Sequence, residues 1–396
     1  MRSVAIGILV RTGSGDEVNK DAGISHFIEH MMFKGTPTRS AFQIAKEIDA
    51  VGGKINAGTG KESTVYYCVI LDEHMQIAID VLQDIFLNSL FDQKEIDLER
   101  KVILEEIRMY EDTPDELIHD LFAEAILSGH PMGRPTIGTA QTVGAMSKEG
   151  MLSYIGQKYK PENIIITVAG NVEHEEIVSK FEPLFGKIKK GGPRQVVQPA
   201  KFSNVVKAKK KKTEQVHICV GAKAISQLDS RRYSFMALDN ILGGSMSSRL
   251  FQEVREKRGL AYSIYSYINA FRDFGFFCVY AGSAMDKYKE VIEIILKELG
   301  KIKKEGLTED ELKRAKEYVK SSIVLGLEST SSRMGWVSRS EFYYDRILSV
   351  DEVFGEVDKI GRDDIIGLAN EYFRDENLAL ALIGDFAEEP RMEMKI

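Results

Sequence analysis

Two histidines and a glutamate with a fixed spacing stand near the start of the chain. The segment from Asp21 to Gly35 reads DAGISHFIEHMMFKG and contains His26, Glu29 and His30 in the pattern H-x-x-E-H. On an α-helix, side chains four residues apart lie about 40° apart around the axis, so both imidazoles can reach one metal ion. Glu29 falls on the same side of the helix, where it can hold a water molecule bound to that metal. The pattern is the inverse of H-E-x-x-H, a metal-binding pattern of helices.

The residues around this pattern are typical of a helix. Asp21 can cap the first turn, Lys34 suits the carboxyl end, and Gly35 before Thr36 and Pro37 can end the helix. An alternative is open, because a five-residue pattern with three fixed positions occurs by chance, and a histidine is more often a packed or surface residue than a ligand. A catalytic zinc also uses three protein ligands and leaves its fourth position to water, so the pattern lacks a third ligand.

Composition excludes several classes of protein. A chain of 396 residues with 43% hydrophobic residues is long and apolar enough for two or more globular domains. A net charge of -7 argues against a nucleic-acid-binding protein, which more often has a basic surplus. Three cysteines argue against a disulfide framework and suit a reducing compartment. No apolar run is long enough to span a bilayer, and we expect no signal peptide before the strand-like start.

Hydrophobic periodicity and turn residues divide the first half of the chain into strands and helices. Ser40 and Gln43 form a capping box, which predicts the start of a helix that Gly52 and Gly53 end. Alternating apolar residues predict strands at 3–11, 54–59, 64–71 and 163–169. Helical periodicity predicts helices at 77–86, 92–109, 115–127 and 175–188.

The second half of the chain repeats the first. Residues 66–71, 95–98 and 159–163 resemble residues 276–281, 311–314 and 373–377, at shifts of 210, 216 and 214. Three matches in one order at a nearly constant shift indicate a duplicated domain. We therefore predict an α+β protein with two homologous two-layer domains, each a mixed or antiparallel sheet packed with helices. The expected boundaries are 1–194 for the first domain, 195–212 for a linker or strand edge rich in lysine, and 213–396 for the second domain.

The duplication also indicates where the chemistry lies. The second half contains no H-x-x-E-H, and at a shift of 216 Glu99 and Glu106 correspond to Ala315 and Ser322. Glu99 and Glu106 are seven residues apart and share one helix face, whereas Glu105 points about 100° away from Glu106. A charged, solvent-facing helix is the alternative explanation for so acidic a segment. The loss of both carboxylates from the duplicate favours a site.

In these features the chain resembles the pitrilysin-type inverzincin peptidases, particularly the half-length branch of the mitochondrial processing peptidase and its bacterial homologues. In that family a third ligand follows the second histidine by 76 residues, which matches Glu106, and a supporting glutamate seven residues earlier matches Glu99. The substrate-binding edge strand of the family carries the pair that matches Asn56 and Ala57. The resemblance covers nearly the whole chain.

The resemblance extends to the second half. An arginine and a tyrosine seven residues apart in that family match Arg255 and Tyr262, which by themselves would be an ordinary helix arginine and strand tyrosine. Two departures stand out. Family members usually begin with a strand before the one at Val4, and the last helix of the family is cut short after Phe386. We expect these differences to leave a sheet edge less protected.

The resemblance implies a zinc-dependent endopeptidase with one Zn²⁺ per chain, held by His26, His30 and Glu106, and with Glu29 as the base. The substrate would be an unfolded peptide or presequence that binds as an added β-strand. The implied assembly is a homodimer in which Arg255 and Tyr262 act on the partner's zinc. The expected location is a bacterial-like cytoplasm, with the mitochondrial matrix as the alternative. The alternative function is a noncatalytic core subunit of the same fold.

Overall fold

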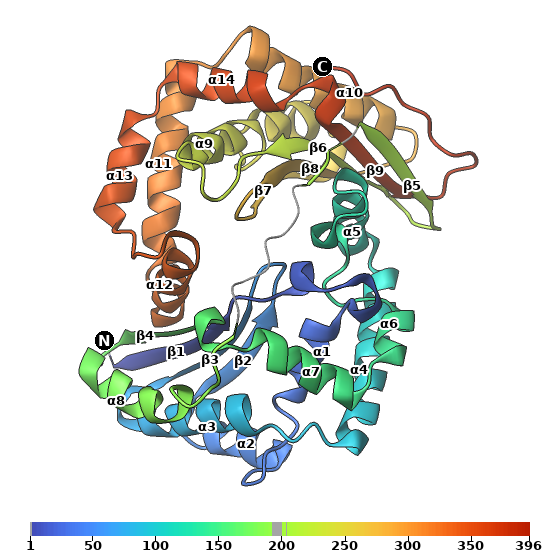
Figure 1. Ribbon diagram of the computed structural model, residues 1–396. Helices are drawn as coiled ribbons and strands as arrows, with labels where there is room; N and C mark the ends of the chain where they lie inside the picture. The colour runs from blue at the N-terminus through green and yellow to red at the C-terminus, as the bar shows by residue number, and fades with distance from the viewer. Residues whose placement is uncertain (1, 192–199, 203) are drawn as a thin grey trace. The chain divides into compact units, whose positions relative to one another are not determined.

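The computed structural model describes residues 2–191, 200–202 and 204–396, which divide into two compact units (Figure 1). The first unit contains Met1–Met109, Arg134–Val197 and Gly326–Ile347. The second contains Tyr110–Gly133, Gln198–Leu325 and Leu348–Ile396. None of the helices in the described residues has the length and apolar character needed to cross a membrane.

The first unit is built on a four-stranded antiparallel sheet with the strand order β2-β3-β1-β4. Alternate residues of the central strand, including Val4, Ile6 and Ile8, are fully buried and pack into one core with the helices. The strands are β1 (Ser3–Val10), β2 (Lys54–Thr59), β3 (Thr64–Leu71) and β4 (Ile164–Gly170). The helices are α1 (Ile24–Met31), α2 (Ala41–Asp49), α3 (Met75–Asn88), α4 (Gln93–Asp112), α6 (Ala140–Ala145), α7 (Lys148–Lys158), α8 (His174–Phe185) and α12 (Thr330–Tyr344).

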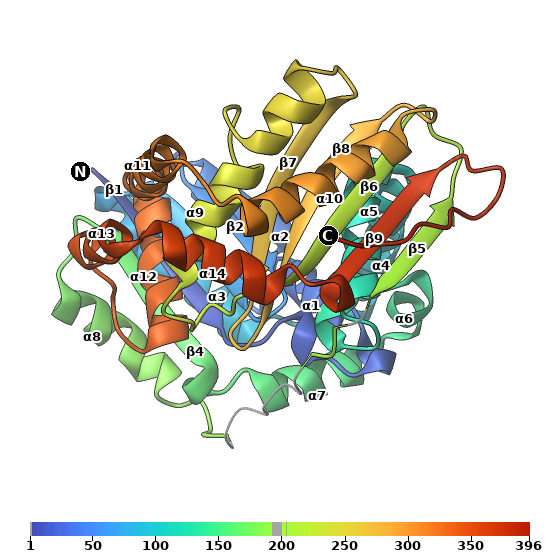
Figure 2. The same ribbon diagram turned by 90° about the horizontal axis from the view of Figure 1, so that it is seen from above.

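The second unit is built on a five-stranded mixed sheet with the strand order β5-β9-β6-β8-β7, in which only β5 and β9 are parallel. Figure 2 shows α10 and α14 lying across this sheet. The strands are β5 (Val205–Lys210), β6 (Val216–Ala224), β7 (Ala261–Ala270), β8 (Gly275–Ser283) and β9 (Leu378–Gly384). The helices are α5 (Pro114–Ile126), α9 (Arg232–Leu242), α10 (Tyr288–Lys304), α11 (Glu309–Gly326), α13 (Val350–Lys359) and α14 (Arg362–Tyr372).

From β1 to β4 and from β6 to β9, strands and helices follow in the same order, as the repeated segments predict. The first pair of matching segments, 66–71 and 276–281, lies in β3 and β8. The second pair lies in α4 and α11, and the third precedes β4 and β9. The predicted fold class, two α+β domains of sheet packed with helices, is confirmed.

One helix of each half packs on the sheet of the other half. In the first unit, α12 lies against β1, where a Cβ on Gly7 would come within 2.7 Å of Met334 Sδ. In the second unit, α5 lies against β6, where a Cβ on Gly221 would come within 2.7 Å of Phe122 Cζ. The expected contiguous domains, 1–194 and 213–396, therefore differ from the compact units by these two helices. An apolar helix face does not reveal which of two similar sheets it covers.

Part of the segment 195–212, expected to be a linker or strand edge, is a strand. Residues 195–199 and 203 lie outside the described residues, and the segment 205–210 forms β5 at one edge of the second sheet. The lysines of β5 lie on an edge strand, because β5 pairs with β9 on one side only in the described part of the chain. This agrees with the expectation of a strand edge. Lysines at an exposed edge oppose pairing with a further strand.

Predictions based on residues close together in the chain agree better with the structure. The capping box of Ser40 and Gln43 is present at the start of α2, and β2 and β3 have the predicted bounds. The expected cap of the motif helix was wrong, because α1 starts after Gly23, a residue with φ of 91°, and Asp21 does not cap it. This helix also ends at Met31, before Lys34 and Gly35.

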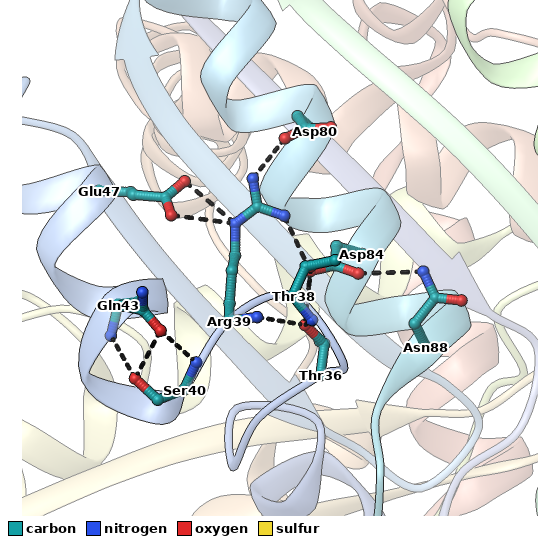
Figure 3. A network of polar contacts seen from close by, with 9 residues as sticks. All are labelled: Thr36, Thr38, Arg39, Ser40, Gln43, Glu47, Asp80, Asp84 and Asn88. Carbon is teal, nitrogen blue, oxygen red and sulfur yellow. Dashed lines mark hydrogen bonds and ion pairs between the residues drawn. The ribbon is translucent and has the colours of Figure 1, made fainter.

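The loop that follows α1 is anchored by a buried carboxylate (Figure 3). Asp84 Oδ2 accepts hydrogen bonds from Thr36 Oγ1 at 2.7 Å, Thr38 Oγ1 at 2.8 Å and Arg39 Nη1 at 2.8 Å. Burial alone would raise the pKa of Asp84, but these hydrogen bonds outweigh it and lower the pKa to about 2. Arg39 also pairs with Glu47, so the loop is tied to both α2 and α3.

Candidate metal centre

The helix α1 separates an apolar face from a polar one. His26, Glu29 and His30 share the polar face, because the spacing of three and four residues places them within about a turn of each other. The opposite face anchors the helix in the core through four buried apolar side chains, Ile24, Phe27, Ile28 and Met31. The same periodicity therefore fixes the helix and aims the candidate ligands away from the core.

A buried glutamate outside the helix caps its first turn. Glu17, which is 4% exposed, accepts hydrogen bonds from the backbone N–H groups of Gly23 at 2.8 Å and Ser25 at 2.9 Å. These are two of the N–H groups that the start of a helix leaves without intrahelical partners. Burial raises the pKa of Glu17 to about 7, although both hydrogen bonds oppose the increase. Sequence reasoning missed this residue, because it lies outside the cap position.

The helix α4 brings a carboxylate to both histidines. The distance from His26 Nε2 to Glu106 Oε1 is 3.8 Å, and that from His30 Nε2 to Glu106 Oε2 is also 3.8 Å. The ligand atoms of the three residues all lie within 4.8 Å of one another, and no other such group of three occurs in the described residues. Glu105, in contrast, is 69% exposed and pairs with Arg108.

This set of atoms fits a zinc ion. Two imidazole nitrogens and one carboxylate oxygen are typical zinc ligands, and three protein ligands leave one position open. Zinc bonds near 2.0–2.1 Å would place ligand atoms about 3.3 Å apart, so the two histidine–carboxylate distances of 3.8 Å are about half an ångström longer than a bound zinc would require. Burial, assisted by nearby His30, lowers the pKa of His26 to about 4, which keeps it in the neutral form that binds metal.

A second glutamate of α4 holds one of the histidines. Glu99 Oε1 lies 2.8 Å from His30 Nδ1, and Glu99 Oε2 lies 2.5 Å from Lys34 Nζ. Burial alone would raise the pKa of Glu99, but the hydrogen bond with His30 and the Lys34 ammonium outweigh it and hold the pKa below its ordinary value. An ionised Glu99 can only accept, so His30 Nδ1–H donates to it, and Nε2 is the ring nitrogen that faces Glu106.

The carboxylate of Glu29 is outside the group of ligand atoms and has its own partner. Thr59 Oγ1, at the end of β2, donates a hydrogen bond to Glu29 Oε2 at 2.5 Å. Burial raises the pKa of Glu29, and the hydrogen bond from Thr59 opposes this increase. Sequence reasoning missed Thr59, because its partner is thirty residues away and on another element.

The predicted substrate strand is an edge strand. In the described residues β2 pairs with β3 on one side only, and it carries Asn56 and Ala57. Asn56 is exposed, and its Oδ1 accepts a hydrogen bond from the N–H of Ala57 at 2.9 Å. The strand that ends in Thr59 therefore keeps one edge available for another backbone.

Arg255 and Tyr262 belong to the second unit, where the structure brings them together. Arg255 lies in a π-helix at Phe251–Glu256, and Tyr262 lies in β7. The guanidinium carbon lies 4.8 Å from the centre of the Tyr262 ring and 4.9 Å from that of Phe251. Tyr262 is 78% exposed, so the pair presents a cation and a hydroxyl to solvent.

Comparison with known proteins gives consistent matches over the chain. The family model described as "Insulinase (Peptidase family M16)" matches residues 1–140, and the model described as "Peptidase M16 inactive domain" matches residues 145–319. The uncharacterized zinc protease YmxG of Bacillus subtilis is 41% identical over 390 residues, which cover 98% of this chain and 95% of that protein. The uncharacterized zinc protease SCO5738 of Streptomyces coelicolor is 40% identical, with 94% and 83% covered.

Two solved structures share the fold. A protease from Helicobacter pylori superposes with a TM-score of 0.90 at 22% identity, covering 97% of this chain and 94% of that chain. A peptidase M16 inactive domain from Pseudomonas fluorescens superposes with a TM-score of 0.91 at 17% identity, covering 99% and 95%. Both of these proteins therefore share the fold of this chain.

Proposed function

The chain belongs to the insulinase family, peptidase family M16, and we propose that it is a zinc-dependent endopeptidase. The observation that carries the proposal is the convergence of His26, His30 and Glu106 on one point, with Glu29 beside them on the same helix. Relatives named zinc proteases over nearly the whole chain support it.

In the proposed mechanism His26, His30 and Glu106 hold one zinc ion per chain. A zinc ion in such a site lowers the pKa of water toward neutrality. Glu29 takes a proton from the attacking water and passes it to the leaving amine. The hydrogen bond from Thr59 Oγ1 to Oε2 helps to hold this carboxylate in place.

The proposed substrate is an unfolded peptide or presequence that binds as an added strand along β2. Backbone hydrogen bonds beside Asn56 and Ala57 would supply much of the affinity, so we expect broad specificity. Arg255 and Tyr262 would hold the substrate backbone or stabilise the oxyanion of the tetrahedral intermediate. Their neighbouring positions in the second unit support a shared role.

The central experiment separates the base from the ligands. Glu29→Gln protein should contain about one zinc per chain and hydrolyse no peptide, because Glu29 moves protons and is outside the ligand group. His26→Ala protein should lose the metal as well. Zinc content by elemental analysis and cleavage of a peptide library would be measured on the same preparations. Zinc-free Glu29→Gln protein would contradict the assignment.

A second experiment tests the third ligand. Glu106→Gln should weaken zinc binding sharply, because this carboxylate faces both imidazoles. Glu105→Gln is the matched control, since its exposed carboxylate pairs with Arg108 and should leave zinc binding nearly unchanged. Zinc affinity from competition with a chelator would be compared for the two variants. The reverse ranking would remove Glu106 from the ligand set.

The alternative function is a noncatalytic core subunit with the same fold. The match to an inactive M16 domain lies at residues 145–319, outside the segments that carry the metal group. A chain with only a structural function would have no need to retain Glu29 together with its three neighbouring ligands. Wild-type protein that binds no zinc and cleaves nothing in the library would favour this alternative.

A further inference from the structure

We propose that Lys34 is a positioning residue for the metal group, which acts through Glu99 on His30. The inference rests on the proposed function, because it concerns the zinc ligands. Lys34 was expected to serve the carboxyl end of the motif helix, but α1 ends three residues earlier at Met31. Its ammonium instead lies 2.5 Å from Glu99 Oε2.

The two oxygens of Glu99 have separate partners. Oε2 pairs with Lys34, and Oε1 lies 2.8 Å from His30 Nδ1. The Glu99 side chain is only 7% exposed, so water has little access to an oxygen that loses its partner. With a partner on each oxygen, the Glu99 carboxylate has one orientation. Lys34 therefore fixes the position of the oxygen that faces His30.

The backbone around Lys34 is itself anchored. The carbonyl of Met32 accepts a hydrogen bond from Ser89 Oγ at 2.9 Å, and that of Gly35 accepts one from Leu90 N–H at 3.0 Å. Thr36 donates to Asp84 in the network of Figure 3. Lys34 thus extends from a segment with fixed points on both sides, which allows a flexible side chain to hold a defined position.

Of the two candidate ligand histidines, only His30 has a hydrogen-bond partner for its Nδ1 in the described residues. His26 Nδ1 is buried without a hydrogen-bond partner in the described residues, whereas His30 Nδ1 has Glu99. Partners that orient a ligand histidine affect metal affinity as well as geometry. The line from Lys34 through Glu99 to His30 is therefore the part of the structure that preorganises a ligand.

The test is the zinc affinity of Lys34→Met protein, measured by competition with a chelator. We expect the affinity to fall about tenfold, the lower end of the effect of removing a direct partner of a ligand, because Lys34 acts on His30 through Glu99. Lys34→Arg, which keeps the charge, should restore most of it. Lys180→Met is the matched control, because Lys180 is equally exposed, at 27% against 28%, and pairs with Glu176 in the same unit. It should leave zinc affinity unchanged.

The Lys34→Met substitution in Glu99→Gln protein distinguishes an effect on the position of His30 from a general structural effect. If Lys34 acts through Glu99, Lys34→Met should weaken zinc binding less than about threefold in Glu99→Gln protein. The absorption spectrum of cobalt-substituted protein should change in Lys34→Met and recover in Lys34→Arg. An equal loss in both backgrounds, or an unchanged affinity in Lys34→Met alone, would overturn the inference and leave the proposed function standing. Wild-type protein without zinc affinity would overturn both.

Discussion

The hydroxyl of Thr59 holds one oxygen of Glu29, while burial raises the pKa of this carboxylate. Thr59→Val keeps the shape of the side chain and removes the hydrogen bond. Hydrogen bonds to charged groups contribute about 1.5–3 kcal/mol, so we expect kcat to fall about 10- to 100-fold. Zinc content should stay close to the wild-type value, because Thr59 is outside the ligand group. Steady-state kinetics on a peptide substrate would measure the effect.

The controls for this prediction lie on the same pair of strands. Thr59→Ser keeps the hydroxyl and should retain most of the activity. Thr64 is the cross-strand partner of Thr59, but its Oγ1 donates to the carbonyl of Thr12. Thr64→Val should therefore disturb the same strand pair without lowering kcat to a similar extent. Equal losses from both valine substitutions would indicate damage to the sheet and not a role for Thr59 at the base.

The first turn of α1 is capped by Glu17, whose carboxyl group titrates near neutrality. The folded-state pKa of Glu17 is about 7, above its ordinary value of 4.5, so the folded protein binds this proton more tightly than the unfolded chain. The resulting stability is complete below pH 4.5 and is lost as the pH rises to about 7. A shift of this size corresponds to a loss on the order of 3 kcal/mol. Glu17→Gln should lack this dependence.

Chemical denaturation between pH 4.5 and 8 would measure the difference in unfolding free energy between wild-type and Glu17→Gln protein. Other titrating groups are common to both proteins and largely cancel. Glu175→Gln provides a control, because Glu175 is an exposed residue in the first turn of α8. A wild-type protein whose stability relative to Glu17→Gln does not change with pH would show that the buried carboxylate does not titrate in this range.

At the scale of the whole molecule, each chain contributes one metal group and one Arg255/Tyr262 pair. We propose a homodimer in which this pair serves the partner's zinc, as the resemblance to the half-length branch led us to expect. Co-expression of a Glu29→Gln chain with an Arg255→Ala, Tyr262→Phe chain should then restore activity. One site of each mixed dimer would combine the intact metal group of the second chain with the intact pair of the first.

An arrangement without a shared site predicts a different activity for the mixed dimers. If each subunit completes its own site, every site in the mixed dimer carries a lesion, and activity stays at the level of the separate variants. Differently tagged chains, purified in sequence over both tags, would establish that mixed dimers are present. Activity that does not return in such a preparation would exclude the shared site.

Features that depend on residues close together along the chain could be predicted from the residue pattern alone. The period of the α-helix places His26, Glu29 and His30 on one face, and the capping box of Ser40 and Gln43 starts α2. Alternation over few residues was enough to predict the bounds of β2 and β3. Comparison of the two halves of the chain indicated Glu99 and Glu106 on α4, because the second half has no carboxylates at the corresponding positions.

Contacts between residues far apart in the chain could be identified only in the folded protein. Glu17 at the start of α1, Thr59 at Glu29 and Lys34 at Glu99 are hydrogen-bond or ion-pair partners whose residue types carry no signal of the contact. The same holds for α5 and α12, since an apolar helix face fits either of two similar sheets. Periodicity along a chain encodes the shape of an element and its buried side, but the partner of that side depends on how the whole chain packs.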